Sequence, residues 1–151
     1  MKVAIGSDEK THLTEMVINN VRDKGHEVLL FGPLRGDEQY WPEVAQETAE
    51  AVVSGEADEG ILFCWTGTGI SLAANKVPGI RAALCGDAET AGGARLWNDA
   101  NILCMSLRAT SEAVAEEILE RWFGTTYTSN EVDDTCMEQI NAIEAKYMVG
   151  R

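Results

Sequence analysis

Basic side chains are scarce in this chain of 151 residues. It carries 12 lysines and arginines against 25 aspartates and glutamates, which gives a formal net charge of −13. A field of that sign repels nucleic acids and anionic membrane surfaces, so neither is expected as a partner. A solvated acidic surface accounts for the charge more simply than binding to a basic partner does.

Long apolar runs and linker-like segments are also missing. No stretch approaches the ~20 apolar residues that a membrane-spanning helix needs, and the apolar run in Met1–Ile5 is too short for a secretory signal. No repeat, low-complexity tract or segment rich in Pro, Gly and Ser divides the chain. We therefore expect one domain over residues 1–151, located in the cytoplasm.

Paired cysteines are absent as well. Three of the four cysteines, Cys64, Cys85 and Cys104, lie at or near the ends of short apolar runs, and none of them forms a CxxC pair with another or with Cys136. This usage predicts reduced thiols in a core rather than disulfides or zinc ligands. No metal site and no cofactor is expected.

Five short apolar runs dominate what is present. They are nearly continuous and rich in aliphatic residues, which is typical of strands buried on both faces. Helical patterns alternate with them, so the sequence predicts a three-layer α/β/α fold around a five-stranded parallel, Rossmann-like sheet. The predicted strands are Val3–Ile5, Val28–Phe31, Ile61–Cys64, Ala82–Cys85 and Ile102–Met105.

The helical patterns place their apolar residues on one face. Trp122 lies on such a stripe and is expected in the core. A last helix, at about 131–148, follows the completed sheet, and its apolar stripe docks either on its own domain or on a second subunit. The stripes are Leu13, Met16, Val17 and Val21; Val44, Ala45, Ala49 and Val52; Val114, Ile118, Leu119 and Trp122; and Val132, Cys136, Ile140, Ile143 and Tyr147.

In an open parallel sheet, ligands bind outside the carboxyl ends of the strands. Four segments follow strand ends and are candidate site loops, at 7–10, 65–69, 86–89 and 106–109. The second is the most distinctive: Cys64 ends a strand, Gly67 and Gly69 make the backbone permissive, and a helix is predicted over Ile70–Lys76.

The glycine loop can direct successive backbone N–H groups at a phosphate or at a developing enolate oxygen. It lacks the third glycine of a dinucleotide-binding loop and the Gly-Lys-Ser/Thr of a Walker A loop. Cys64 just before a helix N-terminus is placed to act as a thiolate base. The alternative is a small apolar residue that closes a strand.

Three segments together form a specific pattern: CWTGTGIS at 64–71, AANKVPGIRAA at 73–83 and NDANIL at 98–103. With Ser7-Asp8 and Arg108 they resemble the family of ribose-5-phosphate isomerase B and galactose-6-phosphate isomerase, and the likeness extends along essentially the whole chain. The resemblance implies interconversion of aldoses and ketoses through a cis-enediolate, without a metal. It also implies dimers or tetramers whose sites are completed across the subunit boundary.

The resemblance also implies residue roles. Cys64 would be the base and Thr66 would assist proton movement, while Asp8 and Asn98 would bond sugar hydroxyls. For Asp8 the alternative is a helix cap, and for Asn98 a turn residue. The other expected substrate contacts are Glu9, Trp41, Trp65, Gly67, Thr68, Gly69, Ser71, Trp97 and Arg108.

Several positions depart from the family pattern. Glu9 and Trp97 stand where the family carries histidines, and the loss at Trp97 removes a group that assists ring opening. The segment Ser129–Thr135 reads SNEVDDT in place of a Gly-Gly-Arg-His segment with further arginines, so only Arg108 remains of the phosphate-gripping set. Acidic side chains there repel a phosphate, which favours an unphosphorylated substrate.

Three of the four tryptophans fall on this predicted site. Trp65 replaces a glycine and Trp41 replaces a tyrosine of the family, and indole faces are good platforms for the C–H face of a sugar. Three function hypotheses follow: an isomerase of an unphosphorylated sugar, an isomerase of a sugar phosphate with Arg108 and donors from another subunit, and a non-catalytic subunit or sugar-binding module.

Overall fold

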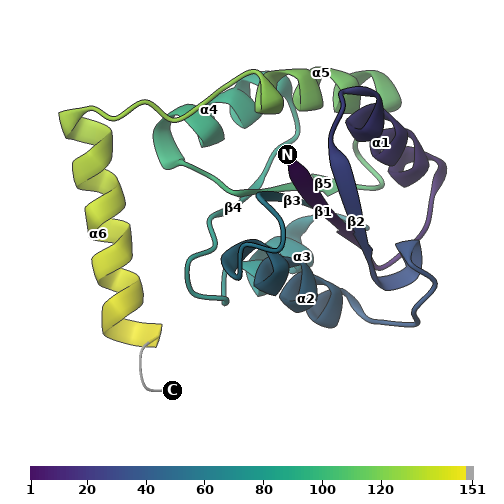
Figure 1. Ribbon diagram of the computed structural model, residues 1–151, viewed down its shortest axis with the longest axis horizontal. Coiled ribbons are helices and arrows are strands. Elements are labelled where there is room, and N and C mark those ends of the chain that lie inside the picture. Colours follow the sequence, from purple (N-terminus) through teal and green to yellow (C-terminus); the bar gives the residue numbers. More distant parts are fainter. Residues whose placement is uncertain (149–151) are drawn as a thin grey trace.

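The chain forms three layers around one parallel sheet (Figure 1). The computed structural model describes residues 1–148, and its strands lie in the order β2-β1-β3-β5-β4. The predicted three-layer fold is confirmed, with strand ends that differ from the predicted ones by at most two residues. The strands are β1 (Lys2–Ser7), β2 (Glu27–Phe31), β3 (Glu59–Cys64), β4 (Ala82–Leu84) and β5 (Ile102–Ser106).

Five helices cover the two faces of the sheet. On one face lie α1 (His12–Asp23), α4 (Ala88–Asn98) and α5 (Glu112–Phe123); on the other lie α2 (Trp41–Val53) and α3 (Thr68–Ala74) (Figure 1). A short 3₁₀ turn, η1 (Gly32–Leu34), follows β2. None of the helices within residues 1–148 combines the length and apolarity that crossing a bilayer requires.

The strands supply both halves of the core because successive side chains point to opposite faces. In β3, Ile61 and Phe63 pack under α1 and α5, whereas Leu62 and Cys64 pack under α2 and α3. All four are nearly or fully buried. This two-sided burial explains why the strand sequences read as continuous apolar runs.

Local capping signals set where the helices begin. Thr11 caps α1 and exchanges hydrogen bonds with Thr14, Asp87 caps α4, and Ser111 caps α5. Each side chain accepts a bond from a backbone N–H that has no partner within the helix. The alternative role of Asp8 as a helix cap is therefore wrong.

The order of the strands creates a switch point between β1 and β3. From β1 the chain crosses to β2 on one side, and from β2 it returns to β3 on the other side. Ser7 pairs with Phe63, so the carboxyl ends of these two strands lie side by side. Such a switch point is where open α/β sheets form their ligand crevice.

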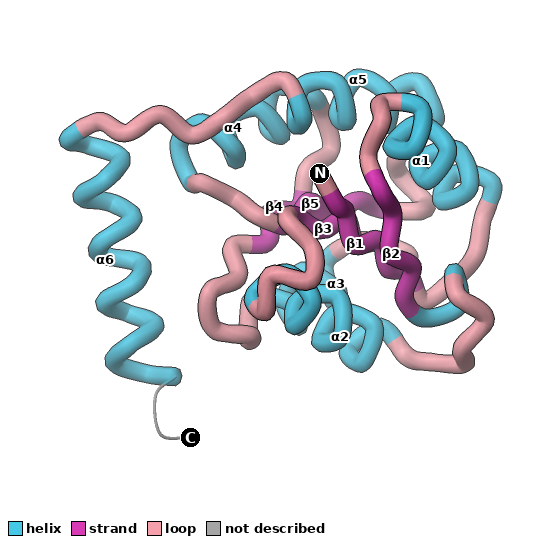
Figure 2. The backbone as a smooth tube through the Cα atoms, in the orientation of Figure 1, coloured by secondary structure: helices cyan, strands magenta, loops and turns pink. Residues whose placement is uncertain are grey.

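The last helix, α6 (Glu131–Met148), stands beside the body at the end of a long connection (Figures 1 and 2). Its bounds match the predicted ones, and residues 149–151 of the predicted domain lie outside the described residues. Glu144 accepts a bond from the N–H of Gly79 at 2.9 Å, but no α6 residue is buried, and Ile143 is 60% exposed. Within one chain the apolar stripe of α6 is left exposed.

Asn75 connects α3 to β4. Its side-chain amide donates to the carbonyl oxygens of Ser71 (3.1 Å) and Ala82 (2.9 Å), and its oxygen accepts from the N–H of Ala82 at 2.8 Å. Replacement Asn75→Ala leaves partly buried backbone groups without partners and should lower the free energy of unfolding by about 1–3 kcal/mol in urea titrations.

The exposed amide Asn19 provides the matched control, since it lies on the outer face of α1. Asn19→Ala should change the free energy of unfolding by less than about 0.5 kcal/mol. Equal effects of the two substitutions would contradict the role of Asn75.

Candidate active site

Cys64 is the last residue of β3, and its side chain faces the α2–α3 side of the sheet with only 5% of the residue exposed. The backbone after it is held by β5. The carbonyl of Cys64 accepts from the N–H of Leu107, and the carbonyl of Trp65 accepts from the N–H of Arg108 and from the Ser106 hydroxyl, each at 3.0 Å. The loop that carries the thiol is therefore fixed by its neighbouring strand.

Gly67 permits the sharp turn after Cys64. Its φ of +76° is a left-handed conformation that glycine adopts readily. A Cβ atom there would lie 2.5 Å from Cδ1 of Leu84 and 3.0 Å from the backbone carbonyl carbon of Met105, so space as well as torsion requires glycine. The turn brings the backbone close to the β4 and β5 ends.

The helix after this turn begins earlier than predicted. It spans Thr68–Ala74 instead of Ile70–Lys76, because Gly67 itself is the N-cap. The N–H groups of Thr68, Gly69 and Ile70 have no hydrogen-bond partner in the described part of the chain, as expected for a first helical turn. These donors stand three to five residues beyond Trp65, the first residue of the loop that follows Cys64.

Hydroxyl groups lie beside these amides. The Thr66 and Thr68 Oγ1 atoms form a hydrogen bond of 2.7 Å, and both residues are exposed. Ser71 is half-buried on α3, one turn further. The arrangement supplies hydroxyls that can exchange a proton and N–H groups that can hold a negative oxygen.

Asp8 follows β1 at the other side of the switch point. It borders an open hollow of about 610 Å³ whose other walls come from η1 and the start of α2. Burial raises the pKa of the Asp8 carboxyl, and the charge of Glu9 acts in the same direction, against a backbone hydrogen bond that lowers it. The remaining lining residues are Pro33, Glu38, Gln39, Tyr40 and Glu43.

Two of the predicted tryptophans lie near the glycine loop. Trp41 begins α2, and its indole lies 3.4 Å from the position that a Cβ on Gly69 would take. Gly69 thus provides room for the ring. Trp65 directly follows Cys64 and is 60% exposed. Trp122, in contrast, is fully buried, as its helical stripe predicts.

Trp97 and Asn98 lie at the opposite edge of the sheet. They end α4, which runs back from the carboxyl ends of the strands, and the nearby carbonyl of Asn101 accepts from the N–H of Gly60 near the start of β3. Gly60 and Cys64 are four residues apart along the strand, or about 13 Å. Within one chain the predicted site residues therefore form two separate groups.

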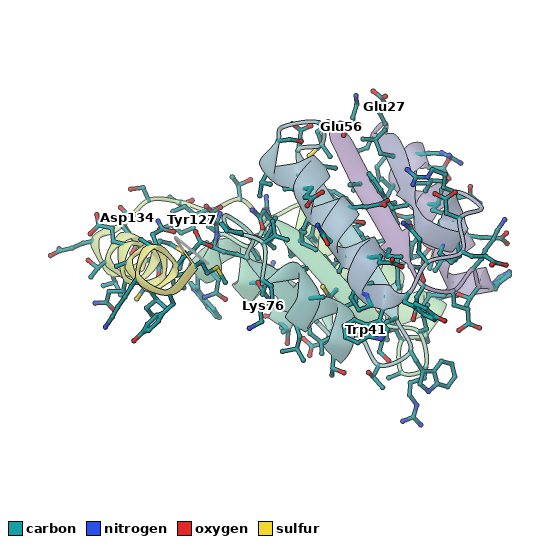
Figure 3. The ribbon with its side chains drawn as sticks, turned by 90° about the horizontal axis from the view of Figure 1, so that it is seen from below. Glu27, Trp41, Glu56, Lys76, Tyr127 and Asp134 are labelled. Carbon is teal, nitrogen blue, oxygen red and sulfur yellow. The ribbon has the colours of Figure 1, made fainter. Side chains whose placement is uncertain are left out.

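Figure 3 shows the two ends of the sheet. Glu27 and Glu56, at the amino ends of β2 and β3, lie at one end of the body, and Trp41 lies at the other. Trp97 is 58% exposed, so its ring is open to contact with another molecule. The alternative role predicted for Asn98 was that of a turn residue. Asn98 is instead the last residue of α4, and the turn begins at Asp99.

The buried cysteines differ in their surroundings. Burial raises the pKa of Cys85 to about 11, and burial also raises the pKa of Cys104, against a hydrogen bond with Ser71. These two groups remain thiols at neutral pH. Within residues 1–148 the four cysteines are free, and no cluster of three His, Cys, Asp or Glu side chains is arranged to hold a metal ion.

The acidic first turn of α6 has a structural role. Asp134 accepts from the hydroxyls of Ser129 (2.6 Å) and Tyr127 (2.7 Å), and Figure 3 shows Tyr127 and Asp134 together at the start of α6. These bonds lower the pKa of Asp134 and raise that of Tyr127 to about 12. Arg108 is exposed and forms no ion pair with any described residue.

No pattern in the sequence marks Glu38, Gln39, Tyr40 and Glu43 as lining the hollow beside Asp8. Tyr40, Glu38 and Glu43 reach the hollow beside Asp8 only because the connection after η1 folds back over β1. The segment has no strand or helix periodicity before α2. Its one local signal is Pro42 in the first turn of a helix, which marks the helix start next to Trp41.

Comparisons with known proteins identify relatives of this chain. A family model described as Ribose/Galactose Isomerase matches residues 3–140. Ribose-5-phosphate isomerase B of Escherichia coli (strain K12) is 36% identical over 146 residues, 96% of this chain and 97% of the relative. A 4-deoxy-4-sulfo-D-erythrose isomerase of Clostridium sp. (strain MSTE9) is 38% identical over 133 residues, 86% of this chain and 83% of the relative.

A solved structure is similar over nearly the full length. Ribose-5-phosphate isomerase B of Clostridium thermocellum superposes with a TM-score of 0.91 at 39% identity, covering 97% of this chain and 99% of that one. Fold and sequence therefore agree on the same group of proteins.

The raised pKa of Asp8 has a consequence for stability. The Asp8 carboxyl of the native state binds its proton more tightly than the same carboxyl in the unfolded chain, whose pKa is 3.8. The stabilising effect of the protonated carboxyl is therefore complete below pH 3.8 and is lost as the pH rises through the native pKa. Replacement Asp8→Asn should therefore raise the melting temperature at neutral pH, and the advantage should shrink as pH falls toward 3.8.

Asp87→Asn is the control of opposite sign. Hydrogen bonds from Thr90 lower the pKa of Asp87, so its contribution is present above the unfolded value and is lost as pH falls. Its loss should lower the melting temperature at neutral pH. A melting-temperature difference for Asp8→Asn that does not vary with pH would rule out the electrostatic explanation.

Proposed function

Because this chain belongs to the ribose/galactose isomerase family, we propose that it interconverts an aldose and a ketose with Cys64 as the base, on a sugar that carries no phosphate. One observation carries the proposal. The Cys64 thiol lies at the switch point of the sheet, directly before a loop and helix start whose N–H groups have no partner among the described residues.

The reaction moves one proton between adjacent carbons. The Cys64 thiolate takes the proton from the carbon next to the carbonyl, and the electron pair of the broken C–H bond forms the carbon–carbon double bond of a cis-enediolate. The former carbonyl oxygen then carries the negative charge, which the N–H groups of Thr68, Gly69 and Ile70 stabilise. The Cys64 S–H returns its proton to the other carbon, which completes the exchange.

A second proton must move between the two oxygens. The bonded hydroxyls of Thr66 and Thr68, 2.7 Å apart, provide a route for it beside the loop amides. Each hydroxyl donates one proton and accepts another, so the pair returns to its starting state after each turnover. Thr66 is the nearer of the two to Cys64 in the chain, which favours it for this role.

Asp8 and the tryptophans would hold the sugar. Hydroxyl groups of the substrate donate to the Asp8 carboxylate, and short charge-assisted bonds of this kind fix the carbon chain against the base. The exposed indoles of Trp41 and Trp65 offer apolar faces to the C–H side of the sugar. Glu9, next to Asp8, is a further candidate contact.

The charges around the hollow support an unphosphorylated substrate. Asp8, Glu38 and Glu43 line it, Glu9 is adjacent, and no lysine or arginine is among its lining residues. A phosphate would be repelled there. The relative named for 4-deoxy-4-sulfo-D-erythrose has a substrate whose name contains no phosphate, which supports substrate variation within the family.

A second copy of the chain would complete the site. Trp97 and Asn98 cannot reach Cys64 of their own chain, and the exposed stripe of α6 offers a surface for a neighbouring subunit. We therefore propose a homodimer or homotetramer with shared sites. Residues 1–151 would act as one domain in the cytoplasm, where free thiols such as those of this chain stay reduced.

A sugar phosphate is the second candidate substrate. The observation in its favour is Arg108, an exposed arginine after β5 that forms no ion pair with the described residues and whose N–H bonds the Trp65 carbonyl. Its guanidinium, with donors from a second copy, would provide charge-assisted bonds to a phosphate.

Proton NMR in D₂O separates these candidates. The purified protein is incubated with free and phosphorylated tetroses, pentoses, hexoses and uronates, and deuterium is followed at the carbon next to the carbonyl. We expect incorporation with unphosphorylated sugars only. Incorporation only with phosphates would overturn the substrate class but not the isomerase, and none with any sugar would favour a subunit that works only beside a paralogue.

Replacement of the base tests the mechanism. Cys64→Ala should lower the exchange rate at least ~10²-fold, the usual contribution of a general base, with little change in melting temperature. Cys85→Ala is the matched control, because it removes a buried thiol on the other face of the sheet. An exchange rate unaffected by Cys64→Ala would exclude Cys64 as the base.

A further inference from the structure

We propose that Arg81 and Arg95 are positioning residues that together fix the turn at 98–101, so that Trp97 and Asn98 are presented in one orientation to the active site of a second copy. The inference rests on the proposed function, since it assumes the shared site. The two residues are called the arginine pair below. Neither of them touches Cys64 or its loop.

The turn is strained. Asp99 has a φ of +45°, and it is the one non-glycine residue with positive φ in the described part of the chain. Side chains other than glycine adopt this conformation at a cost, and such residues persist where their surroundings impose the conformation. Strain of this kind concentrates at functional sites, and here it immediately follows Trp97 and Asn98.

Arg81 holds the turn from the β4 side. Its Nε donates to the carbonyl of Asp99 at 2.8 Å, and its Nη2 pairs with the Asp99 carboxylate at 3.0 Å. Its own N–H donates to the side-chain oxygen of Asn101 at 2.8 Å, and the Asn101 amide donates to the carbonyl of Gly79 at 2.9 Å. Side chain and backbone of Asp99 are thus both held.

Arg95 holds the next carbonyl from inside α4. Its Nη1 donates to the carbonyl of Ala100, and its Nη2 pairs with Glu59 at 2.6 Å. The other oxygen of Glu59 accepts from the Trp122 indole at 2.8 Å, and the Arg95 guanidinium lies 5.0 Å from the Trp122 ring centroid. The arginine pair therefore bonds two consecutive carbonyls, those of Asp99 and Ala100.

The chemistry of this network indicates positioning rather than stability alone. The side chains of Glu59 and Arg95 are only 11% and 14% exposed, and burying such charges costs desolvation energy that an apolar pair would avoid. A planar guanidinium, however, directs several donors along fixed directions, which a lysine does not. The directed N–H donors of Arg95 fix the position of the Ala100 carbonyl, whereas apolar side chains at the same place would not.

The ring of Trp97 is constrained by the same helix end. A Cβ on Gly93 would lie 2.7 Å from Cζ3 of the Trp97 ring, so the missing side chain provides the space in which the ring rests. Trp97 and Arg95 are two residues apart and point away from each other, one to solvent and one inward. Fixing Arg95 and the turn therefore fixes how the exposed ring is directed.

Arg95→Lys tests the arginine pair, because it keeps the charge opposite Glu59 but not the fork that reaches the Ala100 carbonyl. Hydrogen-exchange protection of the Ala100 and Asn101 amides should fall at least ~10-fold. With the sugar found active in the exchange panel, kcat/KM should fall at least ~10-fold, mainly through a higher KM, because the substrate contacts are misplaced. If Arg95→Lys does not fold, Arg81→Lys provides the same test from the β4 side and should lower both quantities.

Trp122→Phe is the matched control. It removes the other hydrogen bond to Glu59 and lowers the melting temperature, but it leaves both bonds to the turn in place. It should change neither the protection of the turn nor kcat/KM. If Trp122→Phe and Arg95→Lys lower kcat/KM equally, general destabilisation explains both and the inference is wrong.

The remaining outcomes separate this inference from the proposed function. An active wild-type protein whose kcat/KM is unchanged by both arginine substitutions overturns the inference only. A wild-type protein inactive with every sugar overturns the proposed function. Unchanged protection of the Ala100 and Asn101 amides overturns the arginine pair whether or not the wild type is active.

Discussion

The parallel pairing of β3 with β1 on one side and β5 on the other is the constraint on which this molecule depends. It brings the end of β1, with Asp8, next to the end of β3, with Cys64. It also lets the residues after β5 bond the carbonyls of Cys64 and Trp65. Without those bonds a loop containing two glycines would sample many conformations, and the Cys64 thiol would not be held in one position relative to the loop amides.

The same sheet also separates the candidate site into two groups. A right-handed crossover returns each helix to the amino edge, so the end of α4 with Trp97 and Asn98 lies about 13 Å or more from Cys64 along β3. A monomer of this fold therefore holds the proposed base, Cys64, without the proposed contacts Trp97 and Asn98 beside it. Assembly of two copies is then a requirement of the shared site, and the exposed stripe of α6 is available for it.

Negative charge surrounds the candidate site. Acidic side chains line the hollow beside Asp8, and in the first turn of α6 the Asp134 carboxylate accepts bonds from Ser129 and Tyr127. A carboxylate that is used in this way remains negative and repels anions. The loop after Cys64 keeps N–H groups at the start of α3 that have no partner among the described residues, so the proposed function combines proton transfer at this loop with a substrate that carries no phosphate.

The sequence by itself determined the layers, the five strands, the long last helix and the burial of Trp122, because burial on both faces and helical periodicity leave a direct pattern in the order of residues. It also singled out the Cys64 loop, whose glycines are required locally. Only the tertiary structure decided that Thr11 rather than Asp8 caps α1, that Glu38, Tyr40 and Glu43 line the hollow beside Asp8, and that Trp97 lies far from Cys64. These three features depend on which chain segments the sheet brings together. The separation of two residues along the sequence does not tell how far apart they lie in the folded chain.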